Sequence, residues 1–118
     1  MPTKVNIPPI VQKEIKHLKR KYPSVVGEVR KLVIKLEADE RPGDKIPGVG
    51  YDVYKVRLPN PSAKRGKSGG FRAIYYVQLA DRVIMVTLYS KTEQTDISPE
   101  EISRILQDLL PSANDDET

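Results

Sequence analysis

The sequence predicts an α+β fold in which two N-terminal helices pack on an antiparallel β-meander sheet and a C-terminal helix follows, in the order (β)ααβββα. In the first third of the chain, apolar residues recur every three or four positions, which is the period of a helix. In the middle third, they alternate over short runs bounded by Gly, Pro and Asn, which is typical of strands. Helical spacing then returns near the C-terminus. The helices are expected to cover one face of the sheet and to leave the other at least partly open.

The N-terminal elements are read from prolines and from apolar spacing. Residues 4–7 are expected to form a short edge strand, because the two prolines after it cannot donate to a sheet ladder. Residues 10–22 form the first helical pattern, which Pro23 interrupts. Ser24 is expected to cap the second helix by accepting a bond from a free first-turn N–H. That helix carries an apolar stripe made of Val25, Val29, Leu32 and Leu36.

The second half predicts three strands and one helix. The Pro- and Gly-rich segment 38–50 is expected to be a loop. The two residues Ala80 and Asp81 are short enough to join the second and third strands in a hairpin. Ser98, followed by Pro99 and a glutamate at the third helical position, predicts the start of the last helix. The expected strands are residues 51–58, 71–79 and 82–89.

Length and composition favour one domain. The 118 residues predict a single domain over 1–110, with a disordered acidic tail over 111–118. The absence of cysteine excludes disulfides and thiol catalysis and suits a reducing cytosol. With His17 as the single histidine, we expect no metal site and no cofactor. No apolar run approaches the ~20 residues of a membrane span, so a cytoplasmic protein without membrane contact is expected.

Basic residues concentrate in one segment. Between Lys55 and Arg72 there are six basic residues and no acidic one, in a chain of net charge +4. A cluster of one sign attracts a polyanion, and nucleic acid is the leading candidate. The alternative is a solvated surface loop. The loop cations expected to contact RNA are Lys64, Arg65 and Lys67.

Strand alternation predicts where the other cations lie. Successive side chains of a strand point to opposite faces, so each strand divides into two sets. The sets expected to meet the helices are Tyr54, Val56 and Leu58, then Phe71, Ala73, Tyr75, Val77 and Leu79, then Ile84, Val86 and Leu88. The opposite sets place Lys55, Arg57, Arg72, Thr87 and Tyr89 on one open surface, with Lys91 just beyond the last strand.

Such a surface suits phosphodiester cleavage. Arginine grips phosphate with two parallel N–H bonds, and lysine adds a compact charge. Cations that face a developing pentacoordinate phosphate stabilise it more than the ground state. The 2′-OH of RNA is itself a nucleophile, so no metal is obligatory. The alternative for each residue is an ordinary solvent-facing position or, for Tyr89, a place at the edge of the core.

Three other features are weaker indications of function. Gly66-Lys67-Ser68 resembles the end of a phosphate-binding P-loop, but Pro61 stands where that pattern needs glycine. His17 lies among lysines and is expected at the surface. Glu93 and Asp96 are candidates for a carboxylate base, although a role in capping the last helix is favoured.

Four segments resemble the RelE/ParE toxin superfamily on its RelE/HigB-like side: YDVYKVRL, GKSGGFRAIYYV, VIMVTLYSKTEQTDIS and EEISRIL. With the two leading helices the resemblance covers roughly residues 4–110. It implies a RelE-like fold and a type II toxin that cleaves messenger RNA in the ribosomal A site and inhibits translation. It also implies a cognate antitoxin protein as partner.

The resemblance assigns roles residue by residue. Lys55 and Arg57 match the alternating basic pair of the first meander strand, and Arg72 matches the arginine that opens the next strand. Lys91 stands where RelE-like proteins place another cation. Ser98 stands where a RelE-like tyrosine is expected, and Tyr89 is the substitute within this chain. Two alternatives stay open: a ParE-like inhibitor of DNA gyrase, and a non-catalytic RNA- or ribosome-binding module.

Overall fold

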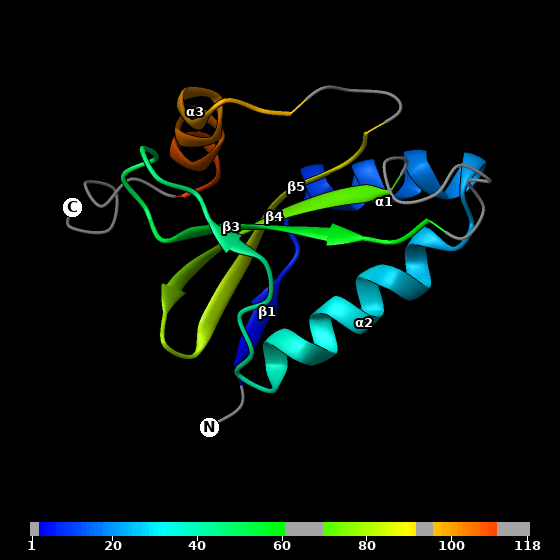
Figure 1. The fold of residues 1–118 in the computed structure, drawn as a ribbon, viewed down its shortest axis with the longest axis horizontal. Coiled ribbons are helices and arrows are strands. Elements are labelled where there is room, and N and C mark those ends of the chain that lie inside the picture. Colours follow the sequence, from blue (N-terminus) through cyan, green and yellow to red (C-terminus); the bar gives the residue numbers. More distant parts are fainter. Residues whose placement is uncertain (1–2, 61–69, 92–95, 111–118) are drawn as a thin grey trace.

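A computed structural model describes residues 3–60, 70–91 and 96–110 of the chain. The loop cations Lys64, Arg65 and Lys67 and the expected tail at 111–118 lie outside the described residues. The elements follow the order predicted from the sequence, with one short strand added (Figure 1). They are β1 (Lys4–Asn6), α1 (Pro9–Lys21), α2 (Val25–Glu37), β2 (Asp44–Lys45), β3 (Val53–Leu58), β4 (Phe71–Leu79), β5 (Arg82–Ser90) and α3 (Pro99–Leu109).

The strands form one mixed sheet in the order β1-β5-β4-β3-β2. The meander β3-β4-β5 is antiparallel as expected, and Leu79 pairs with Arg82 across the predicted two-residue hairpin loop. β1 adds to the outer edge of β5 in parallel. The strand β2 was not expected. It pairs with β3 after Gly43, which has φ +92° and lies so close to the Lys55 carbonyl that a Cβ atom would collide with it.

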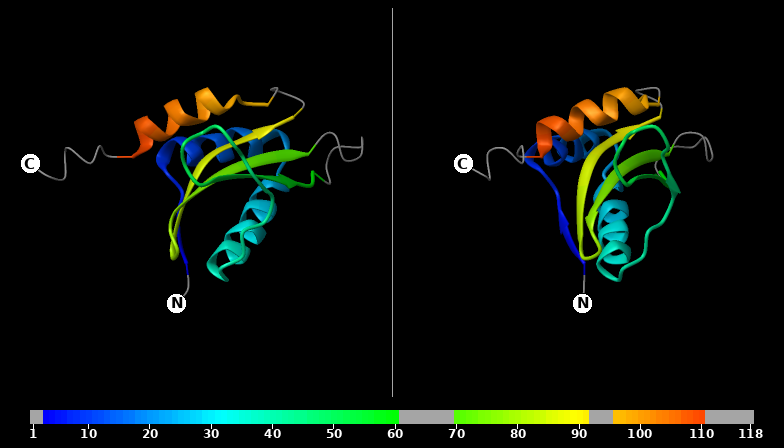
Figure 2. Two further views of the ribbon diagram at one scale, coloured as in Figure 1. Left: turned by 60° about the vertical axis from the view of Figure 1, so that its left-hand side comes forward. Right: turned by 90° about the vertical axis from the view of Figure 1, so that its left-hand side faces the viewer.

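The larger core lies between the sheet and the helices α1 and α2. Val11 and Leu18 of α1 and the predicted apolar stripe of α2 are buried there. They meet alternate residues of β3 and β4, namely Val56, Leu58, Phe71, Ala73 and Tyr75. The two helices lie together on one side of the sheet (Figure 2). The face assigned to these two strands from their alternation is therefore confirmed, except at Leu79, which is 52% exposed next to the hairpin loop.

The C-terminal helix packs on the other face, where the sequence led us to expect a partly open surface. Ile102 and Leu106 of α3 are fully buried against Val53 and Ile74 of the sheet. In Figure 1, α3 lies across the sheet from α2. The physical reason is that Val53 and Ile74 are apolar residues on the face opposite α1 and α2, and they need a cover of their own.

The third strand was assigned correctly only at its C-terminal end. Leu88 faces α1 and α2 and Tyr89 faces α3, as expected. Val83 and Met85 also face α1 and α2, and Val86 faces α3, which reverses the predicted faces of these three residues. The cause is a β-bulge, because the pairing jumps from Ile74↔Thr87 to Tyr75↔Met85 and leaves Val86 between them. An extra residue in one strand reverses the facing of everything beyond it.

Of the two predicted N-cap residues, one is confirmed and the other is wrong. Ser98 caps α3, since its hydroxyl oxygen accepts the Glu101 N–H at 3.2 Å. Ser24 stands at the N-cap of α2 in a helical conformation, with φ −65° and ψ −14°, and its side chain makes no capping bond. Within the described ranges no helix has the length and apolar character needed to cross a membrane.

Candidate nucleic-acid interface

Three predicted site residues form one row across the sheet. Arg57 of β3 pairs with Arg72 of β4, and Arg72 pairs with Tyr89 of β5. Cross-strand partners point to the same face, so the three side chains lie together on the face that also carries α3. Lys55 is two residues from Arg57 on β3 and shares that face. The strands thus bring together at one end of the sheet residues that are up to 34 positions apart.

Asp96 joins this row to Lys91. Its Oδ1 accepts a hydrogen bond from the Tyr89 hydroxyl at 3.1 Å. Its Oδ2 lies 3.3 Å from Lys91 Nζ and 3.7 Å from Lys55 Nζ. We call Lys55, Tyr89, Lys91 and Asp96, with the arginines Arg57 and Arg72 beside them, the cation cluster.

The two arginines differ in exposure. Arg57 is exposed, whereas Arg72 has only 5% of its surface accessible and donates to the Phe71 carbonyl at 3.2 Å. The expectation that Arg72 lies on an open surface is therefore wrong, although it shares the face of Lys55 and Arg57. Gly70 allows this close packing, because a Cβ atom there would lie 2.5 Å from the Leu58 carbonyl oxygen and 3.7 Å from Arg72 Nη1.

The cluster shifts the pKa of two of its members in opposite directions. Burial and the bond to Asp96 raise the pKa of the Tyr89 hydroxyl to about 12, so it stays protonated at neutral pH. For Asp96, partial desolvation works to raise the pKa, but bonds from Lys91 and Tyr89 and the charge of Lys55 outweigh it and lower the value. Asp96 is therefore an ionised carboxylate held against cations.

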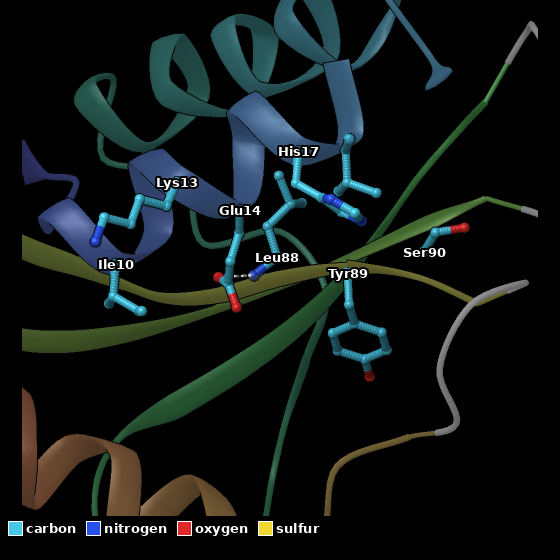
Figure 3. A pocket seen from close by; sticks show the side chains of 8 residues that line it. Ile10, Lys13, Glu14, His17, Leu88, Tyr89 and Ser90 are labelled. Atoms are coloured by element: carbon cyan, nitrogen blue, oxygen red, sulfur yellow. Dashed lines mark hydrogen bonds between the residues drawn. The ribbon is translucent and has the colours of Figure 1, made fainter. Parts of the chain in front are cut away.

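A pocket of about 320 Å³ lies next to the cluster, between α1 and the outer edge of β5. Figure 3 shows Glu14 and His17 of α1 facing this edge, with the Tyr89 ring on the other side of the strand. Glu14 accepts hydrogen bonds from the Leu88 N–H at 3.1 Å and from the Thr87 hydroxyl at 3.0 Å. Burial raises the pKa of Glu14 despite these bonds.

Thr87 is thus not part of the basic surface. It pairs with Ile74 in the same register as Tyr89 with Arg72, but it is 4% exposed and its hydroxyl donates to Glu14 of α1. Tyr76, another aromatic of β4, packs edge-on against Tyr51 with ring centroids 5.4 Å apart, in the core under α3.

A second pocket, of about 470 Å³, lies between α2 and β3. Its lining combines the apolar side chains Ile34, Val56 and Leu58 with Arg57. Ile34 is 58% exposed, which is unusual for a large apolar side chain.

Sequence reasoning found five members of the cluster, Lys55, Arg57, Arg72, Tyr89 and Lys91, and the structure brings all five together. It misjudged Asp96, for which a capping role was favoured. Ser98 caps α3, and Asp96 contacts the cluster. One feature could have identified it: Asp96 follows only five positions after Lys91 in the sequence.

The chain resembles known toxins in sequence and in structure. The family model described as "RelE toxin of RelE / RelB toxin-antitoxin system" matches residues 27–110. A structure of E. coli toxin RelE, an arginine-to-alanine double mutant in the free state, matches with a TM-score of 0.58 and 18% sequence identity, over 93% of this chain and 100% of that one. No curated protein sequence matches.

Proposed function

Because the chain belongs to the RelE toxin family, and so to the toxins of type II toxin–antitoxin systems, we propose that it cleaves messenger RNA in the ribosomal A site. The activity is that of a ribosome-dependent endoribonuclease. It inhibits translation in the cytoplasm, where ribosomes lie. The observation that carries the proposal is the row Arg57–Arg72–Tyr89, with Lys55 and Lys91 beside it.

The exposed members of the cluster are suited to hold the substrate. Arg57, Lys55 and Lys91 have accessible side chains that can bind the phosphate on either side of the cut. Arg72 acts from beneath the surface. A buried cation is poorly screened, so it stabilises the negative charge that develops on the phosphate. The loop cations Lys64, Arg65 and Lys67 add further contacts with RNA.

The reaction uses the 2′-OH of the substrate as the nucleophile. The chain contributes positioning and charge, which account for much of the acceleration in phosphoryl transfer. This step requires neither a metal ion nor a cofactor.

Induced expression in a bacterial host, with mapping of transcript 5′ ends, tests the proposal. Wild type should arrest growth and produce cuts within translated codons, whereas Arg57→Ala and Arg72→Ala should not. Since Arg72 is buried, a thermal melt must accompany its variant, and the exposed Arg57 provides the safer test. The matched control is Arg82→Ala, at the far end of β5, which should stay toxic.

Growth arrest without cuts would refute ribonuclease activity. If gyrase inhibition accompanied it, the ParE-like alternative would hold. Salt-dependent RNA binding without either activity would favour the non-catalytic module.

We also propose a cognate antitoxin that masks the cluster. The pocket between α2 and β3 supports this, since it offers exposed Ile34 beside Arg57 to an amphipathic, acidic segment. Co-expression with the neighbouring reading frame should give a co-purifying complex that Ile34→Lys weakens. If the two proteins separate on purification, this partner is excluded.

A further inference from the structure

Asp96 is the carboxylate on which three members of the cation cluster converge. We propose that Asp96 is the general base that takes the proton from the 2′-OH of the RNA. This inference rests on the proposed ribonuclease function and names a catalytic residue for it.

The contacts of Asp96 orient its two oxygens differently. Oδ1 is held by the Tyr89 hydroxyl, and Oδ2 faces the ammonium groups of Lys55 and Lys91. The side chain is 48% exposed, so a substrate can reach it. A phosphate bound by the two lysines therefore lies next to a carboxylate oxygen, where its neighbouring 2′-OH can donate a proton.

Two other carboxylates near the sheet, those of Glu14 and Asp52, are already occupied. Glu14 accepts hydrogen bonds from the Leu88 N–H and the Thr87 hydroxyl at the edge of β5 that faces α1, and burial raises its pKa. Asp52 pairs with Lys45 of β2 at 3.0 Å. Asp96 alone among these three contacts the residues expected to bind phosphate, and its lowered pKa keeps it in the ionised form at neutral pH.

Asp96 takes the proton of the 2′-OH, the O2′–P bond forms, and the P–O5′ bond breaks. The departing 5′-oxygen takes a proton from the Lys55 ammonium, while Lys91 and the two arginines stay charged and stabilise the phosphorane. The products carry a 2′,3′-cyclic phosphate and a 5′-OH. Asp96 and Lys55 then return to their starting states by exchanging protons with water.

The test compares Asp96→Asn and Asp96→Glu with wild type on programmed ribosomes in single-turnover cleavage. General base catalysis contributes roughly 10²–10⁴-fold, so Asp96→Asn should lower the saturating rate by at least about 100-fold. Its binding to the ribosome should be unchanged or tighter, because a negative charge is removed. Asp96→Glu should recover part of the rate. Asp52→Asn, which removes another lysine-paired carboxylate, should cleave like wild type.

The pH profile separates a base from a positioning group. Between pH 6 and 8 the wild-type contribution of Asp96 should be constant, since its carboxylate stays ionised. The residual cleavage rate of Asp96→Asn should rise more steeply with pH than the wild-type rate, by about an extra factor of ten per pH unit. The reason is that hydroxide then replaces the base.

Two results would overturn the inference while the ribonuclease proposal survives. One is an Asp96→Asn variant as fast as wild type or faster, which would make Asp96 a counter-ion that masks the lysines. The other is a slow Asp96→Asn with a wild-type pH profile and no recovery in Asp96→Glu. A wild type that makes no cut would instead refute the proposed function, and the base with it.

Discussion

Glu14 closes the edge of β5 that β1 leaves uncovered, and replacing it should destabilise the fold. β1 pairs only with the start of β5, from Arg82 to Ile84. Further along, the outward N–H of Leu88 has the Glu14 carboxylate as its acceptor, and the Thr87 hydroxyl donates to the same group. The bond lies at Leu88, next to Tyr89 of the cation cluster, so Glu14 supports the site as well as the sheet.

The expected cost follows from these contacts. Glu14→Ala leaves the fixed Leu88 N–H without its acceptor, at about 1–3 kcal/mol, whereas the Thr87 hydroxyl can rotate to another acceptor. Relief from holding a charge in a half-buried site offsets part of this, so we expect a net loss of about 1–2 kcal/mol. For a chain of this size, that lowers Tm by roughly 4–8 °C. Glu14→Gln keeps an acceptor oxygen and should stay within about 0.5 kcal/mol of wild type.

Thermal melts of the three proteins across pH provide the assay. Because the folded-state pKa of Glu14 is raised, the folded protein binds this proton more tightly than the unfolded chain. Wild type should therefore lose stability relative to Glu14→Gln as pH rises from below the ordinary glutamate value of ~4.3 to above the raised one. An equal loss of Tm in Glu14→Gln and Glu14→Ala, or no loss in Glu14→Ala, would refute this account of the edge.

Three further predictions concern the cluster and its supporting backbone. In denaturant melts, Gly70→Ala should lower the free energy of unfolding by about 1–3 kcal/mol, because the new Cβ meets a β3 carbonyl. Gly27→Ala, which has open space in a helix, should raise it by about 0.5–1 kcal/mol, and equal effects of the two variants would contradict this. Wild type should lose stability as pH rises from the ordinary tyrosine pKa of ~10 to about 12, because the folded state holds the Tyr89 proton more tightly than the unfolded chain. Tyr89→Phe should lose less stability over this range, and an alkaline melt like that of wild type would refute this. Lys91→Gln should raise the pKa of Asp96, measured by carboxyl NMR titration, because a hydrogen-bonding cation is lost; an unshifted titration would argue against the ion pair.

Local rules predicted most of the fold. Periodicity located α1, α2 and the three long strands, and the Ser98-Pro99 start located α3. The short strand β2 was not predicted, because Asp44 and Lys45 form a strand only by pairing with β3. Which face α3 covers also depends on tertiary packing. Ile74 and Val53 did indicate that a second apolar face needed a cover.

The site was predicted as far as alternation holds. Lys55, Arg57 and Arg72 lie on strands without a bulge between them, and their common face was correctly inferred. The bulge at Val86 has no Gly or Pro to mark it, so Val83 and Met85 were assigned to the wrong face. Tyr89 was placed on the correct face, because the register to Arg72 holds beyond the bulge, but the expectation that it lies on an open surface is wrong, since it is 4% exposed. The burial of Arg72 depends on packing that strand alternation does not describe.

The parallel pairing of β1 with β5 has a consequence for how the chain is made. Lys4 finds its partner only at Arg82, so the first strand must wait for nearly the whole polypeptide. Contacts between such distant segments are slow to form, since a long loop must close first. A nascent chain on the ribosome thus presents α1 and α2 long before its sheet is complete, and Asp96 and α3 follow later still. The polypeptide therefore assembles the cation cluster only after both edges of the sheet have been made.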